Sequence, residues 1–276
     1  MKNITAFLFT LLLPLLAISQ PSTEKDSIAF VQQQWQTNKI ARGVLWKSAK
    51  TSNLFNSNQI INILEIDLKK NQKKLALKAL PQSRELTSKL AKESNATVAI
   101  NGGFFDMKNG GAVDFIKVDN QIVNHTRSKS VRANAYLAFD KQSTEISTDS
   151  SSIGHFSNIM LAGPMLISNN SHSTLTKNAF NDNRHPRTAI GIKSNKLVLI
   201  TVDGRRNESQ GMNLHELANL LKWYGCSTAM NLDGGGSTAM YIHSEPHNGI
   251  VNYPSDNNKF DHAGERKVSN IIYVTN

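Results

Sequence analysis

Residues 213–238, NLHELANLLKWYGCSTAMNLDGGGST, place a helix, a buried strand and a glycine loop directly one after another. Asn213 is the predicted N-cap of the helix, Glu216 completes a capping box, and Gly225 ends the helix. The strand Thr228–Leu232 follows at once. A helix that leads straight into a buried strand indicates that both elements pack in one sheet-based domain.

The same order of helix and strand occurs earlier in the chain, in a helix predicted over Gln82–Ser94 and the strand Thr97–Ile100. Elsewhere short runs of β type recur at close spacing, several separated by turn residues such as Asp119-Asn120 and Asp140-Lys141. These runs are Ile60–Leu68, Lys74–Leu80, Phe115–Val118, Gln121–Val123, Ala135–Phe139, Glu145–Thr148, Met160–Ile167, Thr188–Ile192, Lys196–Val202, Thr238–His243 and Val268–Val274. The pattern predicts an α+β protein of one domain, with a largely antiparallel, hairpin-rich sheet and at least two helices packed on it.

The N-terminus has the features of a secretory signal peptide. Lys2 precedes an apolar run over Ile4–Leu16, and Ala17-Ile18-Ser19 supplies small residues at the expected cleavage point. The run is shorter than the roughly 20 apolar residues that span a bilayer, and the single cysteine, Cys226, lies too far downstream for lipid attachment. We therefore predict a signal peptide at 1–19, export to the periplasm or the medium, and no stable membrane anchor.

The remaining chain is predicted to form an N-terminal arm at 20–43 and a single domain at 44–276. The arm combines an amphipathic stretch with a short β-type run, which indicates a docking helix followed by an edge strand. Because the chain has one cysteine, no disulfide can form within it. Cys226 follows the end of a helix and precedes a buried strand, so it is predicted to be a structural thiol.

The chain is basic, with 31 Lys and Arg against 21 Asp and Glu and a formal net charge of +10. A positive field favours acidic partners, and for an exported protein a phosphorylated glycan or glycopolymer fits better than nucleic acid. Solubility alone is the alternative explanation of the charge. The densest basic stretch, over Lys69–Lys78, lies between two apolar alternations and is predicted to be a solvated hairpin tip.

The glycine loop in residues 231–238, NLDGGGST, is the strongest chemical signal in the sequence. Three consecutive glycines add nothing to a core, but their N–H groups can form a concavity for an anion such as phosphate. No lysine follows, so the loop is not a P-loop, and Ala239 stands where a nucleophile elbow needs glycine. A tight hairpin turn is the alternative.

A second glycine pair follows the strand Thr97–Ile100, in residues 101–106, NGGFFD. An amide, a carboxylate and two aromatic rings around the glycines are the mixture expected of a sugar site. The alternative for Phe104 and Phe105 is that they simply cap the core.

Arginines stand at both ends of the predicted hairpin over Thr188–Val202. Arg187 precedes it, while Arg205 and Arg206 follow it, and the guanidinium group matches phosphate oxygens in a bidentate way. We expect Arg206 to be a solvated neighbour. Arg266 either joins the same site or pairs with Glu265. The long polar loop 169–187 beside this hairpin is of the kind that is often functional.

Seven blocks of the sequence occur in the order found in the phosphodiester glycosidase family, typified by the lysosomal uncovering enzyme. They are Ala99–Phe105, Ala162–Leu166, His185–Gly191, Val202–Arg205, Gly211–Ala218, Asn231–Thr238 and Glu265–Asn270. An ordered set of blocks is far more specific than any one glycine motif. The chain thus resembles this family, in its bacterial single-domain form.

The resemblance implies hydrolysis of a sugar-1-phosphodiester, of the N-acetylglucosamine-1-phosphate type, at the anomeric carbon. Phosphate leaves readily, so arginines and backbone N–H groups can stabilise the departing charge without a strong general acid. One carboxylate must still activate water or attack the sugar, and Asp233 is the first choice, with Asp203 and Asp106 next. The residues expected to bind the substrate are Asn101, Gly102, Gly103, Arg187, Arg205, Gly234, Gly235, Gly236, Ser237 and Arg266.

Three alternatives stay open. A calcium or magnesium ion held by Asp233, Asp203 or Asp106 is one, although the eight histidines show no zinc-binding spacing. Another is a non-catalytic, exported polysaccharide-binding protein. The third is a phosphodiesterase that cleaves the P–O bond, which would normally use a clustered two-metal site.

Overall fold

The computed structural model describes residues 22–276, and the predicted signal peptide at 1–19 lies outside them. The strands form antiparallel sheets, and the largest sheet has eight strands. In spatial order these are β1 (Gln36–Ala41), β2 (Val44–Leu54), β3 (Ser57–Asp67), β15 (Lys196–Val202), β14 (Arg187–Lys193), β16 (Thr228–Asn231), β12 (Met165–Ser168) and β13 (Ser171–His172). This sheet contains the longest strands of the described chain, β2 and β3.

Three smaller sheets complete the β structure. The five-stranded sheet contains β10 (Thr144–Ser147), β9 (Ala135–Phe139), β11 (Asn158–Ala162), β7 (Ile116–Val118) and β8 (Gln121–Asn124). The four-stranded sheet contains β17 (Met240–Ile242), β6 (Ala96–Asn101), β19 (Asn270–Thr275) and β4 (Leu75–Ala79), and β18 (Lys267–Val268) pairs with β5 (Glu85–Leu86). The helices are α1 (Ser22–Val31), α2 (Leu68–Asn71), α3 (Thr87–Glu93), α4 (Ala179–Asp182) and α5 (Leu214–Trp223). The predicted α+β class with largely antiparallel strands is confirmed.

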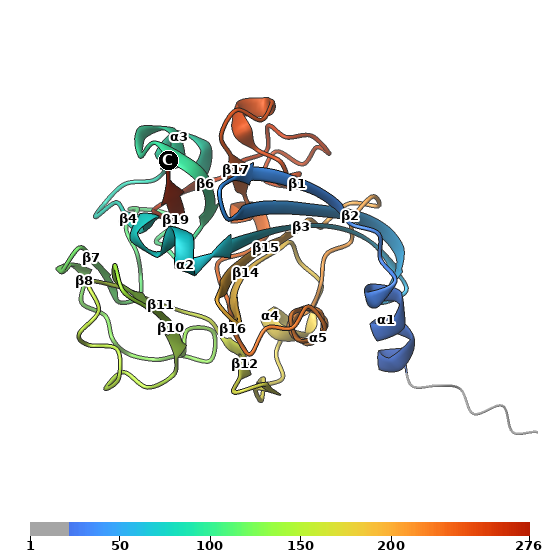
Figure 1. Ribbon diagram of the computed structural model, residues 1–276, viewed down its shortest axis with the longest axis horizontal. Helices are drawn as coiled ribbons and strands as arrows, with labels where there is room; N and C mark the ends of the chain where they lie inside the picture. Colours follow the sequence, from blue (N-terminus) through green and yellow to red (C-terminus); the bar gives the residue numbers. More distant parts are fainter. Residues whose placement is uncertain (1–21) are drawn as a thin grey trace, which may run out of the picture.

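The central strands of the eight-stranded sheet are largely buried, because most of their side chains are apolar on both faces. On β3, Ile61 and Ile63 pack with α5, whereas Leu64 and Ile66 point to the opposite face and pack with the smaller sheets. Figure 1 shows this layering, with α4 and α5 on one side of the long sheet and the smaller sheets on the other. Each fully buried aliphatic side chain of this kind contributes about 2 kcal/mol.

The helix α5 begins and ends where the sequence predicts. The Asn213 side chain accepts from the Glu216 N–H at 2.8 Å, and the Glu216 carboxylate accepts from the Asn213 N–H at 3.0 Å, which is a capping box. Gly225 lies at φ +94° just after the helix. The earlier helix is shorter than predicted, because Glu85–Leu86 pairs as a strand and α3 begins at Thr87.

Two sequence-based expectations, one about a strand and one about a hairpin, are wrong. The run Met160–Ile167 divides at Gly163-Pro164 into β11 and β12, which belong to different sheets. The basic stretch Lys69–Lys78 is not a hairpin tip, because β3 and β4 also belong to different sheets. A helical turn capped by Asp67 carries the chain between them.

The N-terminal arm forms a docking helix and an edge strand, as predicted. The buried ring of Phe30 on α1 lies 6.0 Å from that of Trp223 and 6.3 Å from that of Tyr224. Asp26 accepts a hydrogen bond from the Phe55 N–H at 2.8 Å. Among the strands of residues 22–276, β1 pairs with β2 alone and is therefore the outermost strand of the sheet.

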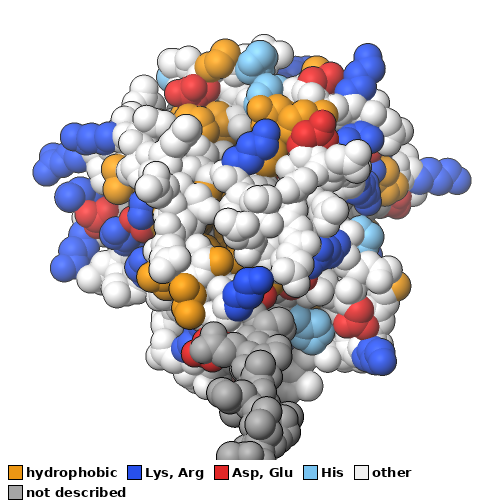
Figure 2. All heavy atoms as spheres, turned by 90° about the vertical axis from the view of Figure 1, so that its right-hand side faces the viewer, with side chains coloured by type: hydrophobic (Ala, Val, Ile, Leu, Met, Phe, Trp, Pro, Cys, Tyr) orange, Lys and Arg blue, Asp and Glu red, His pale blue; other side chains and the backbone are white. Residues whose placement is uncertain are grey.

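Basic side chains are spread over the surface. Figure 2 shows Lys and Arg over much of one face, with several gathered at its left edge and fewer acidic groups among them. Among the helices of residues 22–276, none combines the length and the apolar character needed to cross a membrane.

Cys226 is a packing residue, and we expect Cys226→Ser to lower the free energy of unfolding by about 1–2 kcal/mol. The thiol is 1% exposed, and burial raises its pKa to about 12. It lies so close to Gly191 that a Cβ there would be 2.9 Å from the sulfur. Urea unfolding measures the loss, while the turnover of the folded fraction should stay unchanged. A large loss of turnover in fully folded protein would place the thiol in the functional site.

Candidate functional site

The two glycine segments of the sequence meet at one point. Each follows a strand, β6 for Gly102 and β16 for Asp233, and the two strands lie in different sheets. The Asp233 N–H donates to the Gly102 carbonyl at 3.0 Å, and the Asn101 amide donates to the Asp233 carbonyl at 2.6 Å. The junction of the two sheets therefore fixes the backbone that carries Asp233.

Through its side chain, Asn101 connects the segments that meet at this junction. Its side chain is fully buried, and its Oδ1 accepts from the Thr188 hydroxyl at 2.8 Å and from the Ala239 N–H at 3.1 Å. With the bond to Asp233, both ends of its amide are taken up by the protein. Asn101 thus positions the site from behind and does not offer a free group to a substrate.

Gly102 and Gly103 allow Asn270 to approach the same backbone. The Asn270 side chain accepts from the Gly103 N–H at 2.6 Å. A Cβ on Gly102 would stand 2.3 Å from Asn270 Oδ1. The absence of a side chain at Gly102 is therefore a packing requirement.

The triple glycine forms a tight turn under two arginines. A Cβ on Gly234 would meet the Pro186 carbonyl at 2.7 Å, and the Gly235 N–H donates to that carbonyl at 2.8 Å. Gly235 lies at φ +61°, in the left-handed region. The segment Gly235–Ser237 is one turn of 3-10 helix, and because β16 and β17 belong to different sheets, it is not a hairpin turn.

Arg205 and Arg266 cover this turn. A Cβ on Gly235 would lie 2.9 Å from Arg205 Nη2, and one on Gly236 would lie 2.5 Å from Arg266 Nη2. Burial and the neighbouring Arg266 charge lower the pKa of Arg205. Arg266 Nε donates to Asp256 at 2.9 Å, so Arg266 pairs with Asp256 and not with Glu265. Two guanidinium groups side by side create a site for an anion.

Asp233 lies close enough to Arg266 for the arginine charge to act on its carboxyl. Burial raises the pKa of its carboxyl to about 6. The nearby Ser237 hydroxyl, the Arg266 charge and the Gly234 N–H oppose that rise. A carboxyl group with a pKa near 6 can hold or release a proton close to neutral pH, as acid–base catalysis requires.

Asp203 lies deeper in the protein. It is 1% exposed, and its Oδ1 accepts from Asn252 Nδ2 at 2.9 Å and from the Tyr253 N–H at 3.0 Å. Burial raises its pKa to about 7. These contacts make Asp203 an anchor for the loop after β17.

Asp106 lies in a separate loop. Its Oδ1 accepts from the Lys108 N–H at 2.7 Å and from the Asn109 N–H at 3.0 Å, and these bonds lower its pKa. The carboxylate therefore stabilises its own turn. Nothing in its contacts connects it to Asp233.

Arg187 is buried and not directed at the glycine loop. Its Nε donates to the Met212 carbonyl at 2.8 Å, and its Nη2 donates to the carbonyls of Phe180 at 2.7 Å and Asn183 at 2.9 Å. It is 1% exposed. Its guanidinium group thus holds together the loop that precedes β14.

We expect Arg187→Ala to lower the free energy of unfolding by about 3 kcal/mol or more, because buried carbonyls lose charged donors. Thermal unfolding measures this loss. Turnover per folded molecule should fall less than in Arg205→Ala. If Arg187→Ala is as stable as the wild type but loses turnover, Arg187 contacts the substrate after all.

Sequence reasoning missed several neighbours of Asp233 and Arg205. The charge of Arg132 acts to lower the pKa of Asp233. The Cζ atom of Arg132 lies over the Phe104 ring, 4.5 Å from the ring centroid. The pKa of His185 is lowered by burial and by the charges of Arg187 and Arg205, which favours the neutral imidazole. Arg132 stands in a polar loop without glycine or periodicity, so no sequence signal marks it.

The candidate carboxylates do not converge. Asp233, Asp203 and Asp106 each have separate partners, as described above. Within residues 24–276, no three side chains of His, Cys, Asp or Glu come together in a way that could hold a metal ion. The site is therefore built from Asp233, Arg205, the ion pair of Arg266 with Asp256, and a glycine turn.

The family model of the phosphodiester glycosidases matches residues 94–275. The N-acetylglucosamine-1-phosphodiester alpha-N-acetylglucosaminidase of Bos taurus is 29% identical over 213 residues, which are 69% of this chain and 39% of the bovine protein. The human enzyme of the same name is 28% identical over 193 residues, covering 63% of this chain and 36% of that protein. The chain spans about two fifths or less of these curated relatives.

Solved structures share the fold. The catalytic domain of zebrafish N-acetylglucosamine-1-phosphodiester alpha-N-acetylglucosaminidase, auto-inhibited by its pro-peptide, has a TM-score of 0.67 at 22% identity, over 92% of each chain. A Synechocystis protein has a TM-score of 0.74 at 15% identity, over 87% of this chain and 63% of that one. Since the family model covers more than half of the sequence and includes the glycine turn and Asp233, the chain belongs to the phosphodiester glycosidase family.

Proposed function

We propose that this protein is a glycosidase that hydrolyses the anomeric C–O bond of a sugar-1-phosphodiester. The observation that carries the proposal is the position of Asp233, a carboxyl with a pKa of about 6 beside a glycine turn covered by Arg205 and Arg266. The arginines suit a phosphate group, and the carboxyl suits the sugar carbon next to it.

The arginines, more than the glycine N–H groups, would bind the phosphate. The Gly235 N–H is already bonded to Pro186, and the Gly234 N–H interacts with the Asp233 carboxyl. As the C1–O bond breaks, its electron pair passes to the phosphate oxygen, and Arg205 and Arg266 stabilise that charge. The product is a phosphomonoester.

Asp233 would act on the other side of the broken bond. As a general base it takes a proton from water, whose oxygen bonds to C1 and yields the free sugar. As a nucleophile its carboxylate bonds to C1, and water then hydrolyses that intermediate. Both routes consume one water molecule and need the ionised carboxylate at the start.

The substrate class that we propose is a phosphorylated glycan or glycopolymer with an N-acetylglucosamine-1-phosphate type of linkage. The curated relatives are named for that linkage. The basic net charge of the chain favours such a polyanion.

Hydrolysis of the methyl diester of N-acetylglucosamine 1-phosphate in oxygen-18 water tests the reaction. We expect methyl phosphate without label, because the new oxygen bonds to carbon. Phosphate oxygens do not exchange with water under these conditions, so mass spectrometry of the phosphomonoester is decisive. Label in the phosphomonoester would indicate P–O cleavage, and no hydrolysis together with glycan binding would indicate a binding protein.

We further propose that the protein is exported, from the signal-peptide pattern at 1–19. Such an enzyme would meet glycopolymers outside the cytoplasm. N-terminal sequencing of the mature protein tests this proposal. A mature chain that still begins at Met1 and stays with the membrane fraction would contradict it.

A further inference from the structure

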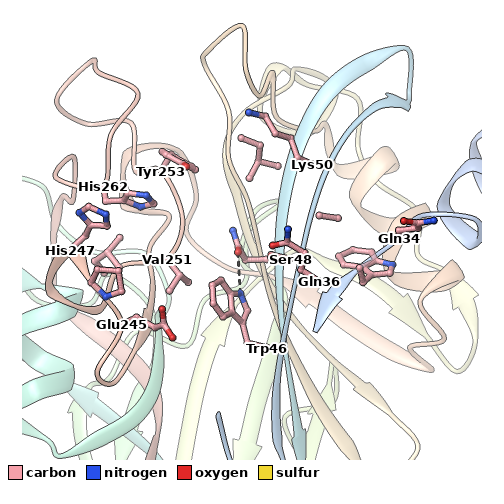
Figure 3. A pocket seen from close by; sticks show the side chains of 16 residues that line it. Gln34, Gln36, Trp46, Ser48, Lys50, Glu245, His247, Val251, Tyr253 and His262 are labelled. Atoms are coloured by element: carbon pink, nitrogen blue, oxygen red, sulfur yellow. Dashed lines mark hydrogen bonds between the residues drawn. The ribbon is translucent and has the colours of Figure 1, made fainter. Parts of the chain in front are cut away.

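A cavity lies on the molecule whose lining includes neither Arg205 nor the glycine turn. It has a volume of about 670 Å³. One wall is the outer end of the long sheet, and the other is the loop between β17 and β18 (Figure 3). We call it the aromatic cleft, and define it by Trp35, Trp46, Asn62, Glu245 and Tyr253.

On the sheet wall, a polar residue interrupts the apolar side chains of β3, although packing of the core does not require it. On β3, Leu64 and Ile66 belong to the core, whereas Asn62, on the same face, is polar. The Asn62 Oδ1 accepts from Trp46 Nε1 at 3.1 Å, shown as a dashed line in Figure 3. Asn62 is 2% exposed, and its Nδ2 has no partner among the described residues. A buried amide donor that is free is costly unless a ligand uses it.

The loop wall adds stacked rings. Tyr253 lies 4.2 Å from His262 and 4.1 Å from Phe260, measured between ring centroids. Figure 3 places Tyr253, His262, Val251 and Glu245 on the loop side, facing the strand that carries Trp46. Phe260 and His262 cover the two faces of the Tyr253 ring, so its edge is the part left for a ligand. An aromatic residue on the sheet wall, Trp46, and hydrogen-bonding groups on both walls match a sugar ring, whose faces are apolar and whose edge carries hydroxyls.

The charge of the cleft favours a neutral ligand. Besides histidines, its lining contains one cation, Lys50, and one anion, Glu245. This differs from the site at Asp233, where two arginines lie together. Phosphate therefore has no preferred place in the cleft.

The two sites share one loop. Tyr253 lines the cleft, while Asp256 on the same loop pairs with Arg266 beside the glycine turn. Consecutive Cα atoms are 3.8 Å apart, so these two residues lie at most about 11 Å apart along the chain. The cleft and the glycine-turn site are thus joined through one short stretch of this loop.

We propose that the aromatic cleft binds neutral sugar rings of a glycan, with stacking on Trp46, contact with the edge of Tyr253 and a hydrogen bond from Asn62. The kind of ligand rests on the proposed function, but binding in the cleft does not require hydrolysis. The cleft would hold units of the glycan next to the phosphodiester.

Binding of the neutral trisaccharides of N-acetylglucosamine, maltose and cellulose type tests this proposal. Isothermal titration of the wild type and of Asp233→Asn should show the same affinity for at least one of them. Tyr253→Ala should weaken that binding about tenfold or more, which corresponds to about 1.4 kcal/mol. The matched control is Phe260→Ala, which breaks the same ring stack without removing a cleft residue and should bind normally.

A comparison of two Trp46 variants distinguishes the loss of a ligand contact from misfolding. Trp46→Phe keeps an aromatic face but loses the N–H that orients Asn62, so its loss of affinity should be smaller than that of Trp46→Ala. The proposal is overturned if no trisaccharide binds at millimolar concentration, or if Phe260→Ala and Tyr253→Ala weaken binding equally. It is also overturned if binding is lost in Arg205→Ala, because the sugar would then occupy the glycine-turn site. Continued hydrolysis of the small methyl diester in each case would show that the proposed function itself stands.

Discussion

Asp233→Asn is expected to lower turnover on a sugar-1-phosphodiester by about 10³-fold or more, because the base or nucleophile is removed while the shape is kept. N-acetylglucosamine 1-phosphate should still bind, since Arg205 and Arg266 remain. Steady-state kinetics and calorimetry on the same preparation measure both quantities. The matched control is Asp106→Asn, whose carboxylate only stabilises its own turn, and which should keep its turnover. Full activity in Asp233→Asn would shift the choice of carboxylate to Asp203.

The pH dependence follows from the same carboxyl. Because the reaction needs ionised Asp233, kcat/KM should fall as the pH drops below about 6.

The ionisation of Asp233 affects the stability of the fold in the opposite direction. The folded protein holds the Asp233 proton more tightly than the unfolded chain, so this group makes the fold less stable as the pH rises from about 4 to about 6. Asp233→Asn should therefore have a higher Tm than the wild type at pH 7, while the two differ less at pH 4.

Arg205→Ala and Arg266→Ala should each lower the rate by about 10²–10³-fold, because each removes charge from the leaving phosphate. Unlike Asp233→Asn, they should also weaken binding of N-acetylglucosamine 1-phosphate. A substrate with an activated aryl phosphate needs less help in departure and should partly restore the arginine variants. The same substrate should leave Asp233→Asn inactive.

Arg206→Ala is the matched control for Arg205, since it removes the charge of the neighbouring residue in the chain. It should retain the rate of the wild type within a few fold. Equal rescue of Asp233→Asn and the arginine variants by the aryl substrate would mean that the two roles are assigned wrongly. An equal loss of rate in Arg206→Ala and Arg205→Ala would mean that net charge alone, and not the position of Arg205, explains the effect.

The sequence alone determined the local elements and the type of chemistry. The helix α5 is readable because Asn213, Glu216 and Gly225 are fixed by hydrogen bonds and backbone geometry within a few residues of one another. Turns such as Asp119-Asn120 are readable for the same reason, and both residues adopt positive φ. Local sequence patterns also predicted the glycine turn and the carboxylate beside it.

Only the tertiary structure decided which strands share a sheet and which side chains share a site. The run Met160–Ile167 reads as one strand, but long-range pairing divides it between two sheets. Arg187 and Arg205 look alike in sequence, yet buried carbonyls surround the first and the second lies over Gly235. Asp256 and Arg132 come from distant loops without any local signal. Such differences arise because desolvation and charge pairing depend on neighbours far along the chain, which no local pattern records.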